Sequence, residues 1–391
     1  MRIRFKKSDL LQAVGVVQSV ANPQSTLPIL SNVLITTEHD NLAVFLATDF
    51  ETRVRVEIPA EVDSKGSATV PARTFNDLVK ELPDDGEVIF ESLEKGASIR
   101  CREIRAELAT MPANDFPEWP KMDTKVSLDI PQKELKRLLD KVLFAVPTRD
   151  PRKVLLGSLF EIRANSLTAV ATDGKILAMM KIPLQTEFSA GGGNHNVIVP
   201  HKILEELGKH LGDDGNVTFS FDDRQLSFRL NRILYFSNQI EGKYPNYDAV
   251  VPKEFSRELR FQKPPMISAI RRASILTDMK NNAITLSFAG DKVVVEGESY
   301  DKGRIHEEIP AVSDDEAFKI VFNYKFISEV LKALDKEEVV LQVNQPTTPA
   351  VFRGAESPDA FYLVMPIKLT EVPDYEGSEV RAGVMEETEE V

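Results

Sequence analysis

The chain repeats one pattern of apolar residues three times, and this repeat constrains the fold more than any other feature. Four apolar residues with the spacing 3, 1, 3 begin at Phe75, at Leu204 and at Ile327. This spacing places the four side chains on one stripe of an α-helix. A short β-rich run follows each time, at 87–90, 216–219 and 338–341, so each copy predicts a helix followed by a strand.

A second helix with the same spacing lies upstream in each copy, beginning at Leu10, Leu135 and Met266. We therefore expect an α+β fold of three tandem domains, each with two helices and antiparallel sheets. The proline-containing closures of the copies place the domains at 1–122, 123–252 and 253–369. The segment 370–391 is acidic and poor in apolar residues, and we expect a disordered tail there.

Basic residues recur in register with the second helix of each copy. They lie two residues before its first apolar position and seven residues further on: Arg73 and Lys80, Lys202 and Lys209, Lys325 and Lys332. Seven residues are about two helical turns, so each pair shares one face. An ordinary solvated helix face explains any single pair, whereas recurrence in all three copies favours one shared positive surface.

The charge of the whole chain is acidic, with a formal net charge of −13. Glu371, Asp374, Glu376, Glu379, Glu386, Glu387, Glu389 and Glu390, against Arg381 alone, account for much of it. An acidic protein does not grip phosphates over its whole surface. A basic inner face with an acidic exterior is compatible with this balance, since screening limits each field to about 8 Å.

The sequence also indicates a cellular location. Residues 1–7 have no apolar core and are not expected to form a secretory signal. No apolar run approaches the length that spans a bilayer, and the single cysteine, Cys101, fits a reducing compartment. We expect a cytoplasmic protein with no membrane partner.

Enzymatic chemistry has weak support. Asp49 and Asp173 occupy equivalent positions after Thr48 and Thr172, where a pair of catalytic carboxylates is conceivable and a turn between strands is the simpler interpretation. The sequence shows no metal-ligand cluster, nucleophile elbow, phosphate loop or dinucleotide fingerprint. We expect no catalysis, metal or cofactor; a hydrolase using either aspartate is one alternative function, and a monomeric three-domain scaffold is another.

Several short motifs together resemble one family. They lie at 26–30, 70–73, 116–117, 171–174, 244–247 and 364–366, and in this order and spacing they resemble the bacterial sliding clamps, the beta subunits of DNA polymerase III. The resemblance runs from Met1 to Leu369. It implies a non-catalytic processivity factor in DNA replication: a head-to-tail homodimer of six similar domains, with helices lining the hole and sheets outside.

Helix dimensions agree with that arrangement. Twelve helices about 10 Å wide give a ring with an opening of roughly 28 Å, whereas the six of one chain leave about 9 Å. A duplex, whose major groove alone is about 12 Å wide, cannot pass through the smaller opening. One chain is thus too short to encircle DNA, and two suffice; loose phosphate contacts then permit sliding without sequence preference.

The resemblance also implies three sets of site residues. A groove between the second and third domains would take short hydrophobic-aromatic peptides of DNA polymerases, the clamp loader, mismatch-repair proteins and ligase-type proteins; it maps to Leu155, Thr172, Gly174, Lys175, Leu177, Pro245, Val250, Leu363, Met365, Pro366 and Ile367. The DNA-facing set adds Gln24, Arg149, Arg152 and Lys153 to the six recurring bases. The dimer contacts map to Arg105, Leu108, Ile275, Leu276, Glu307 and Glu308, with Arg73 and Arg105 facing the two glutamates; Ala106 replaces the aromatic residue usual near Leu108.

The acidic tail departs most from the family pattern, because clamps often end near Leu369. It begins beside the implied groove. We expect it to reduce occupancy of the groove by masking it or by repelling acidic peptides.

Overall fold

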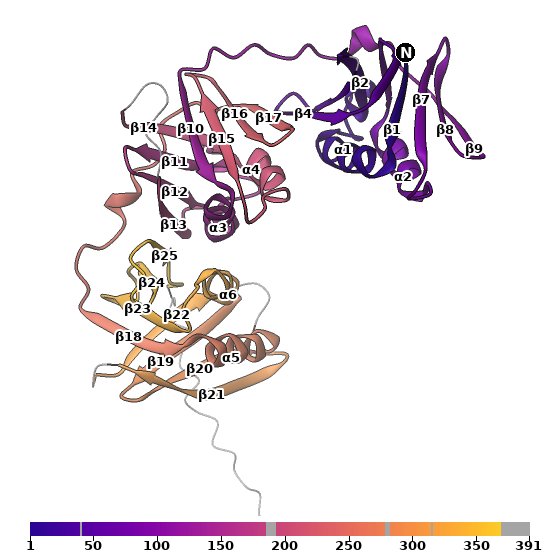
Figure 1. Ribbon diagram of the computed structural model, residues 1–391. Helices are drawn as coiled ribbons and strands as arrows, with labels where there is room; N and C mark the ends of the chain where they lie inside the picture. Colours follow the sequence, from indigo (N-terminus) through magenta and orange to yellow (C-terminus); the bar gives the residue numbers. More distant parts are fainter. Residues whose placement is uncertain (40, 185–192, 278–281, 314–315, 369–391) are drawn as a thin grey trace, which may run out of the picture.

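A computed structural model describes the chain except for residues 40, 185–192, 278–281, 314–315 and 369–391, so the predicted tail lies outside the described residues. The described chain forms three similar units that follow one another along an arc (Figure 1). Each unit holds two α-helices: α1 (Lys7–Val20) and α2 (Ala72–Glu81), α3 (Gln132–Val142) and α4 (His201–Gly208), α5 (Lys263–Ile275) and α6 (Tyr324–Ala333). All six predicted helices are confirmed.

The strands also repeat from unit to unit. The first unit contains β1 (Arg2–Lys6), β2 (Asn32–His39), β3 (Leu42–Thr48), β4 (Thr52–Pro59), β5 (Glu61–Ser64), β6 (Ser67–Pro71), β7 (Glu87–Leu93), β8 (Gly96–Cys101) and β9 (Ile104–Leu108). The second contains β10 (Val126–Pro131), β11 (Gly157–Arg163), β12 (Ser166–Thr172), β13 (Ile176–Pro183), β14 (His195–Pro200), β15 (Asn216–Phe221), β16 (Gln225–Leu230) and β17 (Ile233–Asn238). The third contains β18 (Arg257–Gln262), β19 (Ala283–Ala289), β20 (Lys292–Ser299), β21 (Gly303–Val312), β22 (Phe318–Asn323), β23 (Glu338–Val343), β24 (Ala350–Gly354) and β25 (Ala360–Val364).

The repeated apolar stripes make the core. Phe75 and Leu204 are fully buried and Ile327 is 1% exposed, because one face of each helix packs on the sheets of its own unit. Truncating such a buried side chain to alanine typically costs about 2–5 kcal/mol. The stripe that the sequence shows is therefore what fixes each helix to its sheets, and it leaves the opposite helix face to solvent.

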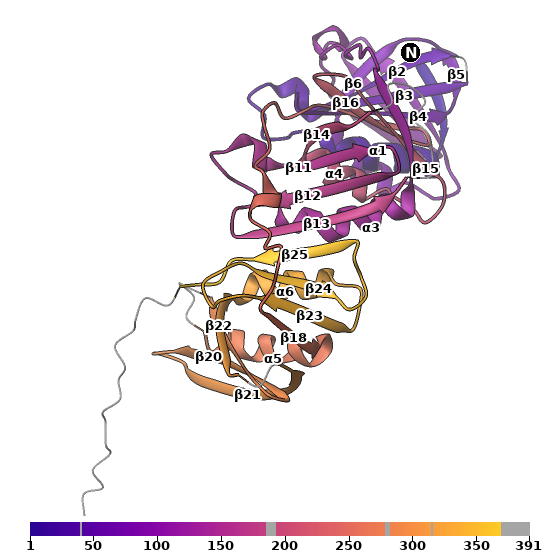
Figure 2. The ribbon, with the colours of Figure 1, turned by 90° about the vertical axis from the view of Figure 1, so that its left-hand side faces the viewer.

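Two sheets continue from one unit into the next. In an eight-stranded sheet, β4 of the first unit pairs antiparallel with β17 of the second; in a twelve-stranded sheet, β13 of the second pairs with β25 of the third. Main-chain hydrogen bonds thus join the units, which gives the arc a defined curvature. The views in Figures 1 and 2 place the helices on the concave side of the arc and the sheets on its outer side.

Candidate functional site

The concave face carries the recurring bases, and three of the six have an acidic neighbour three or four residues away in the sequence. Arg73 lies 3.9 Å from Asp77, Lys209 lies 2.8 Å from Glu206, and Lys332 lies 2.7 Å from Glu329. Lysine and arginine outnumber aspartate and glutamate on α3, α5 and α6, whereas they balance on α1 and α2. Glutamate outnumbers lysine on α4, so the excess of basic residues on the helices is concentrated on α3 and on the third unit.

Two of the predicted DNA-facing residues are held by carboxylates. Lys202 on α4 forms an ion pair with Asp49 of the first unit. Arg152 donates two hydrogen bonds of 2.9 Å to the Asp150 carboxylate, which hold the pKa of Asp150 at about 2. These two cations are partly neutralised within the chain, so they contribute less to a phosphate-binding surface than an unpaired lysine does.

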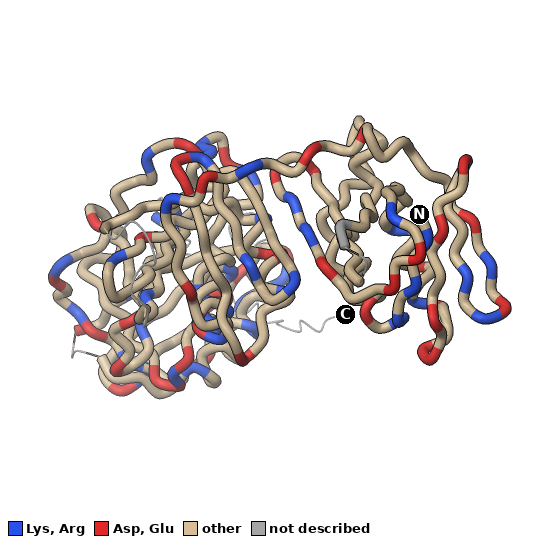
Figure 3. Tube along the Cα trace, turned by 45° about the horizontal axis from the view of Figure 1, so that its top comes forward, with Lys and Arg blue, Asp and Glu red and all other residues tan. Residues whose placement is uncertain are grey.

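The other predicted DNA-facing side chains are accessible. Gln24, Lys80, Arg149, Lys153 and Lys325 are exposed. In the tube view, lysines and arginines are interspersed with aspartates and glutamates along the three units (Figure 3). This interspersion fits weak, non-specific contact with a polyanion.

Asp49 and Asp173 are turn residues. Asp173 Oδ1 accepts the backbone N–H groups of Lys175 and Ile176 at 2.7 and 2.8 Å. Asp49 Oδ1 accepts those of Glu51 and Thr52 at 3.1 and 2.7 Å. Each carboxylate therefore fixes a turn between two strands, as the simpler interpretation of the sequence predicts. Within the described residues, no group of three or more His, Cys, Asp and Glu side chains could hold a metal ion.

The predicted peptide groove lies where β13 meets β25. Leu177 pairs directly with Leu363 across the junction of the units, and the Met365 N–H donates to the Lys175 carbonyl oxygen at 2.8 Å. Leu155, Leu177 and Leu363 are at most 3% exposed and belong to one apolar cluster with Tyr244. These residues form the floor of the site.

The rim of the same site exposes apolar and polar groups. Val250 is 51% and Met365 37% exposed, and Pro245, Gly174 and Lys175 are also exposed. Gly174 has a positive φ of 89°, and a Cβ on it would lie 3.4 Å from the Arg152 guanidinium. Thr172 is buried, and its Oγ1 accepts the Gly174 N–H at 3.0 Å, which holds this tight turn. Pro366 and Ile367 are half-buried. The predicted groove residues thus come together at one junction.

At the junction between the first and second units, the position equivalent to the predicted groove is covered. There Phe236 pairs with Arg53 where Leu363 pairs with Leu177 at the second junction. The Trp119 ring lies 6.1 Å from that of Phe236, and Arg53 donates a 2.6 Å hydrogen bond to the Glu118 carbonyl oxygen. The segment that links the first two units therefore covers its own junction, which the sequence alone did not reveal.

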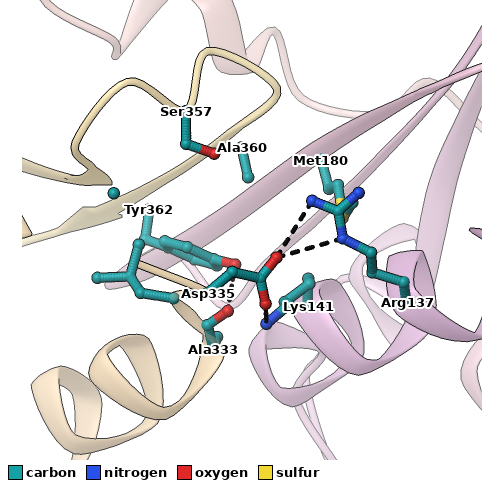
Figure 4. A pocket seen from close by; sticks show the side chains of 10 residues that line it. Arg137, Lys141, Met180, Ala333, Asp335, Ser357, Ala360 and Tyr362 are labelled. Atoms are coloured by element: carbon teal, nitrogen blue, oxygen red, sulfur yellow. Dashed lines mark hydrogen bonds and ion pairs between the residues drawn. The ribbon is translucent and has the colours of Figure 1, made fainter. Parts of the chain in front are cut away.

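An ion-pair cluster at the second junction was also missed by sequence reasoning. Arg137 and Lys141 on α3 reach across to Asp335, just after α6, with the Arg137 nitrogen 3.1 Å from the carboxylate (Figure 4). They line a cavity of only about 10 Å³. Burial raises the pKa of the Asp335 carboxyl, but the hydrogen bonds and charges of Lys141 and Arg137 outweigh burial and hold the pKa below its usual value.

The junction between the first two units is less tightly filled. A cavity of about 370 Å³ lies beside Asp9, Gln12, Glu57, His210 and Arg232. Gln12 takes the place on α1 that Arg137 takes on α3. The ion pairs that close the second junction therefore have no counterpart in the residues around this cavity.

The two ends of the arc carry strands that are equivalent to those that pair at the internal junctions. β9 is equivalent to β17 and β25, and β21 is equivalent to β4 and β13 in the order of strands within each unit. β9 lies at the edge of its five-stranded sheet, and the described part of β21 pairs with β20 along residues 303–310 and with β18 only at Ala311 and Val312. Each end of the arc thus presents one half of a junction.

The predicted dimer residues lie at these ends. Ile275 is 65% exposed at the end of α5, while Leu108 and Leu276 are half-buried and Arg105 is exposed. Glu307 and Glu308 have partners within the chain, because Arg272 donates to Glu307 at 2.7 Å and Lys292 lies 2.7 Å from Glu308. These ion pairs hold the pKa of both carboxyls low. Cross-subunit pairing of Arg73 and Arg105 with these glutamates stays a prediction.

Comparison with known proteins decides the family. Three family models of the DNA polymerase III beta subunit match in order: its N-terminal domain at residues 1–120, its central domain at 129–246 and its C-terminal domain at 248–368. The chain belongs to the DNA polymerase III beta subunit family, the beta sliding clamps. Its function is therefore that of a DNA sliding clamp in replication, and the processivity factors of this family are not catalysts.

Individual clamps support this assignment over their full length. The beta sliding clamp of Pseudomonas putida is 31% identical over 376 residues, and that of Synechocystis 30% over 390; each alignment covers 94% of this chain and all of the relative. The crystal structure of the Pseudomonas aeruginosa beta subunit superimposes with a TM-score of 0.90 at 28% identity, over 94% of this chain and all of that one. A Pseudomonas aeruginosa clamp bound to griselimycin gives 0.89 at 28% identity with the same coverage. The C-terminal family match ends at residue 368, so the acidic segment lies beyond it.

Proposed function

We propose that two copies of this chain join head to tail into a closed ring around duplex DNA, and that the ring tethers partner proteins without catalysis of its own. The observation that carries this proposal concerns β9 and residues 303–310 of β21, which each pair with one strand only in the described chain. They are the two halves of the junction already formed twice within the chain. A head-to-tail contact that is repeated with the same geometry generates a ring when the rotations between successive copies add up to a full turn.

The internal junctions specify how the two copies pair. At both, the first residue of one strand lies opposite the fifth of the other: Ile233 opposite Val56, and Ala360 opposite Met180. The same rule sets Ile104 of β9 opposite Glu307 of β21. It also sets Glu107 directly opposite Arg304, which is a favourable cross-strand pair. The position occupied by Leu177 and Leu363 at the second junction is charged here, so each subunit has one apolar groove.

The mechanism is topological. A closed ring cannot leave the duplex sideways, so a polymerase bound to the ring stays on its template. Helices with scattered bases on the concave face contact phosphates weakly and without reading sequence. The groove of Val250, Met365 and the buried leucines takes short hydrophobic-aromatic segments of DNA polymerases, the clamp loader, mismatch-repair proteins and ligase-type proteins. We propose that this takes place in the cytoplasm, and that ring opening requires a separate loader.

Charge reversal at the joint tests the ring. Glu107→Arg and Arg304→Glu each place like charges opposite one another at both joints of the ring. A loss of about 1 kcal/mol per joint raises the dimer dissociation constant about 30-fold. The double variant restores opposite charges and is expected to restore most of the affinity. Sedimentation velocity over a dilution series measures all four proteins.

Two outcomes would contradict the pairing. The first is a wild-type chain that remains monomeric at tens of micromolar, which would favour the monomeric scaffold. The second is a double variant as weak as the two single changes combined, which would show that Glu107 and Arg304 do not face each other. Retention of the closed dimer on a circular duplex, and its release when the duplex is cut, then tests encirclement directly.

A further inference from the structure

Four lysines that form no ion pair with any described residue lie beside the peptide groove. Lys153, Lys175, Lys243 and Lys368 are exposed, and within the described residues none of them takes part in an ion pair. On the concave face, by contrast, Arg73, Lys209 and Lys332 each have a carboxylate within 4 Å. The rim of the groove therefore carries four lysines without ion pairs, beside the exposed carboxylates of Glu241 and Asp248.

The four lysines flank the apolar floor closely. Lys153 precedes Val154 and Leu155 of the floor cluster, and Lys243 precedes Tyr244 of the same cluster. Gly242 has a positive φ of 132°, and a Cβ on it would lie 2.7 Å from Val154 Cγ1, so the segments of Lys153 and Lys243 touch. Lys175 follows Gly174 in the turn between β12 and β13. Lys368 is the last residue that the structure describes.

The described part of the chain ends beside this groove. The Met365 N–H bonds to the Lys175 carbonyl oxygen, and the Ile367 N–H bonds to the Val321 carbonyl oxygen, each at 2.8 Å. These bonds hold residues 365–367 against the groove. The sequence then continues for 23 residues, 369–391, with eight acidic side chains, one arginine and apolar residues that include Val372, Tyr375, Val380, Val384 and Met385.

We propose that the acidic segment 370–391 occupies this groove in its own subunit and competes with partner peptides. The inference rests on the proposed function of the groove. Its carboxylates lie near the lysines of the rim, and its apolar residues cover Val250 and Met365. The segment thereby acts as a tethered competitor that a partner must displace, so it selects partners with high affinity or several contact points.

Tethering makes weak contacts sufficient. A flexible chain of 22 residues has an end-to-end distance of about 25 Å, and a short flexible tether gives an effective concentration in the millimolar range. An intramolecular dissociation constant of about 0.3 mM would then leave most grooves occupied. Because exposed charges carry much of the attraction, the competition weakens as salt rises and the screening length falls from about 30 Å at 0.01 M to about 3 Å at 1 M.

Fluorescence polarisation of a labelled probe tests the proposal. The probe is a synthetic peptide of two leucines followed by phenylalanine, without charged side chains, and it is measured against the full chain and against a chain ending at Leu369. At 25 mM salt, we expect the shortened chain to bind the probe three- to tenfold more tightly. The difference is expected to fall below twofold at 0.5 M salt. A full-length variant whose eight tail carboxylates are changed to amides is expected to bind like the shortened chain.

Two further measurements identify the contact. The change of Lys153, Lys175 and Lys243 to glutamine is expected to remove the difference between full and shortened chains, whereas glutamine at Lys6, Lys65 and Lys95, which are exposed in the first unit, is expected to leave it intact. A synthetic peptide of residues 370–391 is expected to displace the probe from the shortened chain. Equal probe affinity of the full and shortened chains at low salt overturns the tail proposal. Failure of both chains to bind either the probe or griselimycin overturns instead the groove on which it rests.

Discussion

Tyr235 and Tyr362 occupy equivalent positions at the two internal junctions of the chain. Each is the third residue of the strand that pairs with the preceding unit, and each is at most 1% exposed. The Tyr235 hydroxyl lies 2.9 Å from His210 Nδ1, and the Tyr362 hydroxyl donates to the Ala333 carbonyl oxygen at 3.4 Å. Both bonds reach the end of the second helix of the same unit. At the open end of the arc, the third residue of β9 is Ala106.

The change Ala106→Tyr is therefore expected to strengthen the joint between subunits. A buried aromatic side chain there adds about 1–3 kcal/mol of apolar contact, and the dimer dissociation constant is expected to fall at least tenfold. Sedimentation of diluted samples measures it, with Ala109→Tyr, just after β9, as the control. A weaker dimer than wild type would show that the joint is filled differently from the internal junctions.

The Asp335 cluster predicts a pH dependence of stability. Because the pKa of Asp335 is lowered in the folded chain, its stabilising effect is complete above the unfolded value near 4 and is lost as the pH falls through the folded value. Asp335→Asn is expected to cost about 1 kcal/mol at pH 7, and this cost is expected to shrink below pH 4. Urea unfolding at several pH values measures it; a constant difference down to pH 2 would contradict the assignment.

Equivalent lysines on two helices are expected to differ in their effect on DNA binding. Lys325 is exposed, whereas Lys202 is held by Asp49. Lys325→Ala is expected to reduce the slope of log affinity against log salt by about 1 for a short duplex. Lys202→Ala is expected to change the slope less and to lower the stability of the first junction. Fluorescence anisotropy with a labelled duplex compares the two, and equal slopes would contradict the difference.

Substitutions of Asp173 test whether its carboxylate has a structural role in the turn. Asp173→Ala removes the acceptor of two backbone N–H groups and is expected to cost about 1–3 kcal/mol of unfolding free energy. Asp173→Asn keeps an acceptor oxygen and is expected to lose less than half of that. Chemical denaturation measures both changes. Equal losses for both variants would show that the carboxylate charge, rather than the acceptor, is required.

The sequence predicted the repeated parts of this molecule well because periodicity reports burial. The stripes at Phe75, Leu204 and Ile327 identify helices that pack on their sheets in all three units. The strands at 87–90, 216–219 and 338–341 lie within β7, β15 and β23. In the part of the chain that the structure describes, none of the helices has the length and apolar character needed to cross a bilayer.

The periodic patterns of the sequence did not predict the contacts between units. Neither the Asp335 cluster nor the tilted ring contact of Trp119 with Phe236 follows from spacing, because each joins residues from different units. The sequence revealed the regular spacing of the basic residues but not their ion-pair partners. It therefore did not indicate that Asp49 pairs with Lys202. The residues of the groove came from family resemblance, and the pairing of Leu177 with Leu363 explains why they meet.

The unlike strands at the two ends of the chain also carry a risk of uncontrolled polymerisation. A heterologous contact of β9 with β21 returns to its starting point only if the rotation per copy divides a full turn; otherwise it continues as an open helical filament. That rotation depends on the angles at β4 with β17 and at β13 with β25. Asp335 and Trp119 make contacts at these two junctions, so residues far from the joint between subunits contribute to whether assembly stops at two copies or proceeds to a fibre.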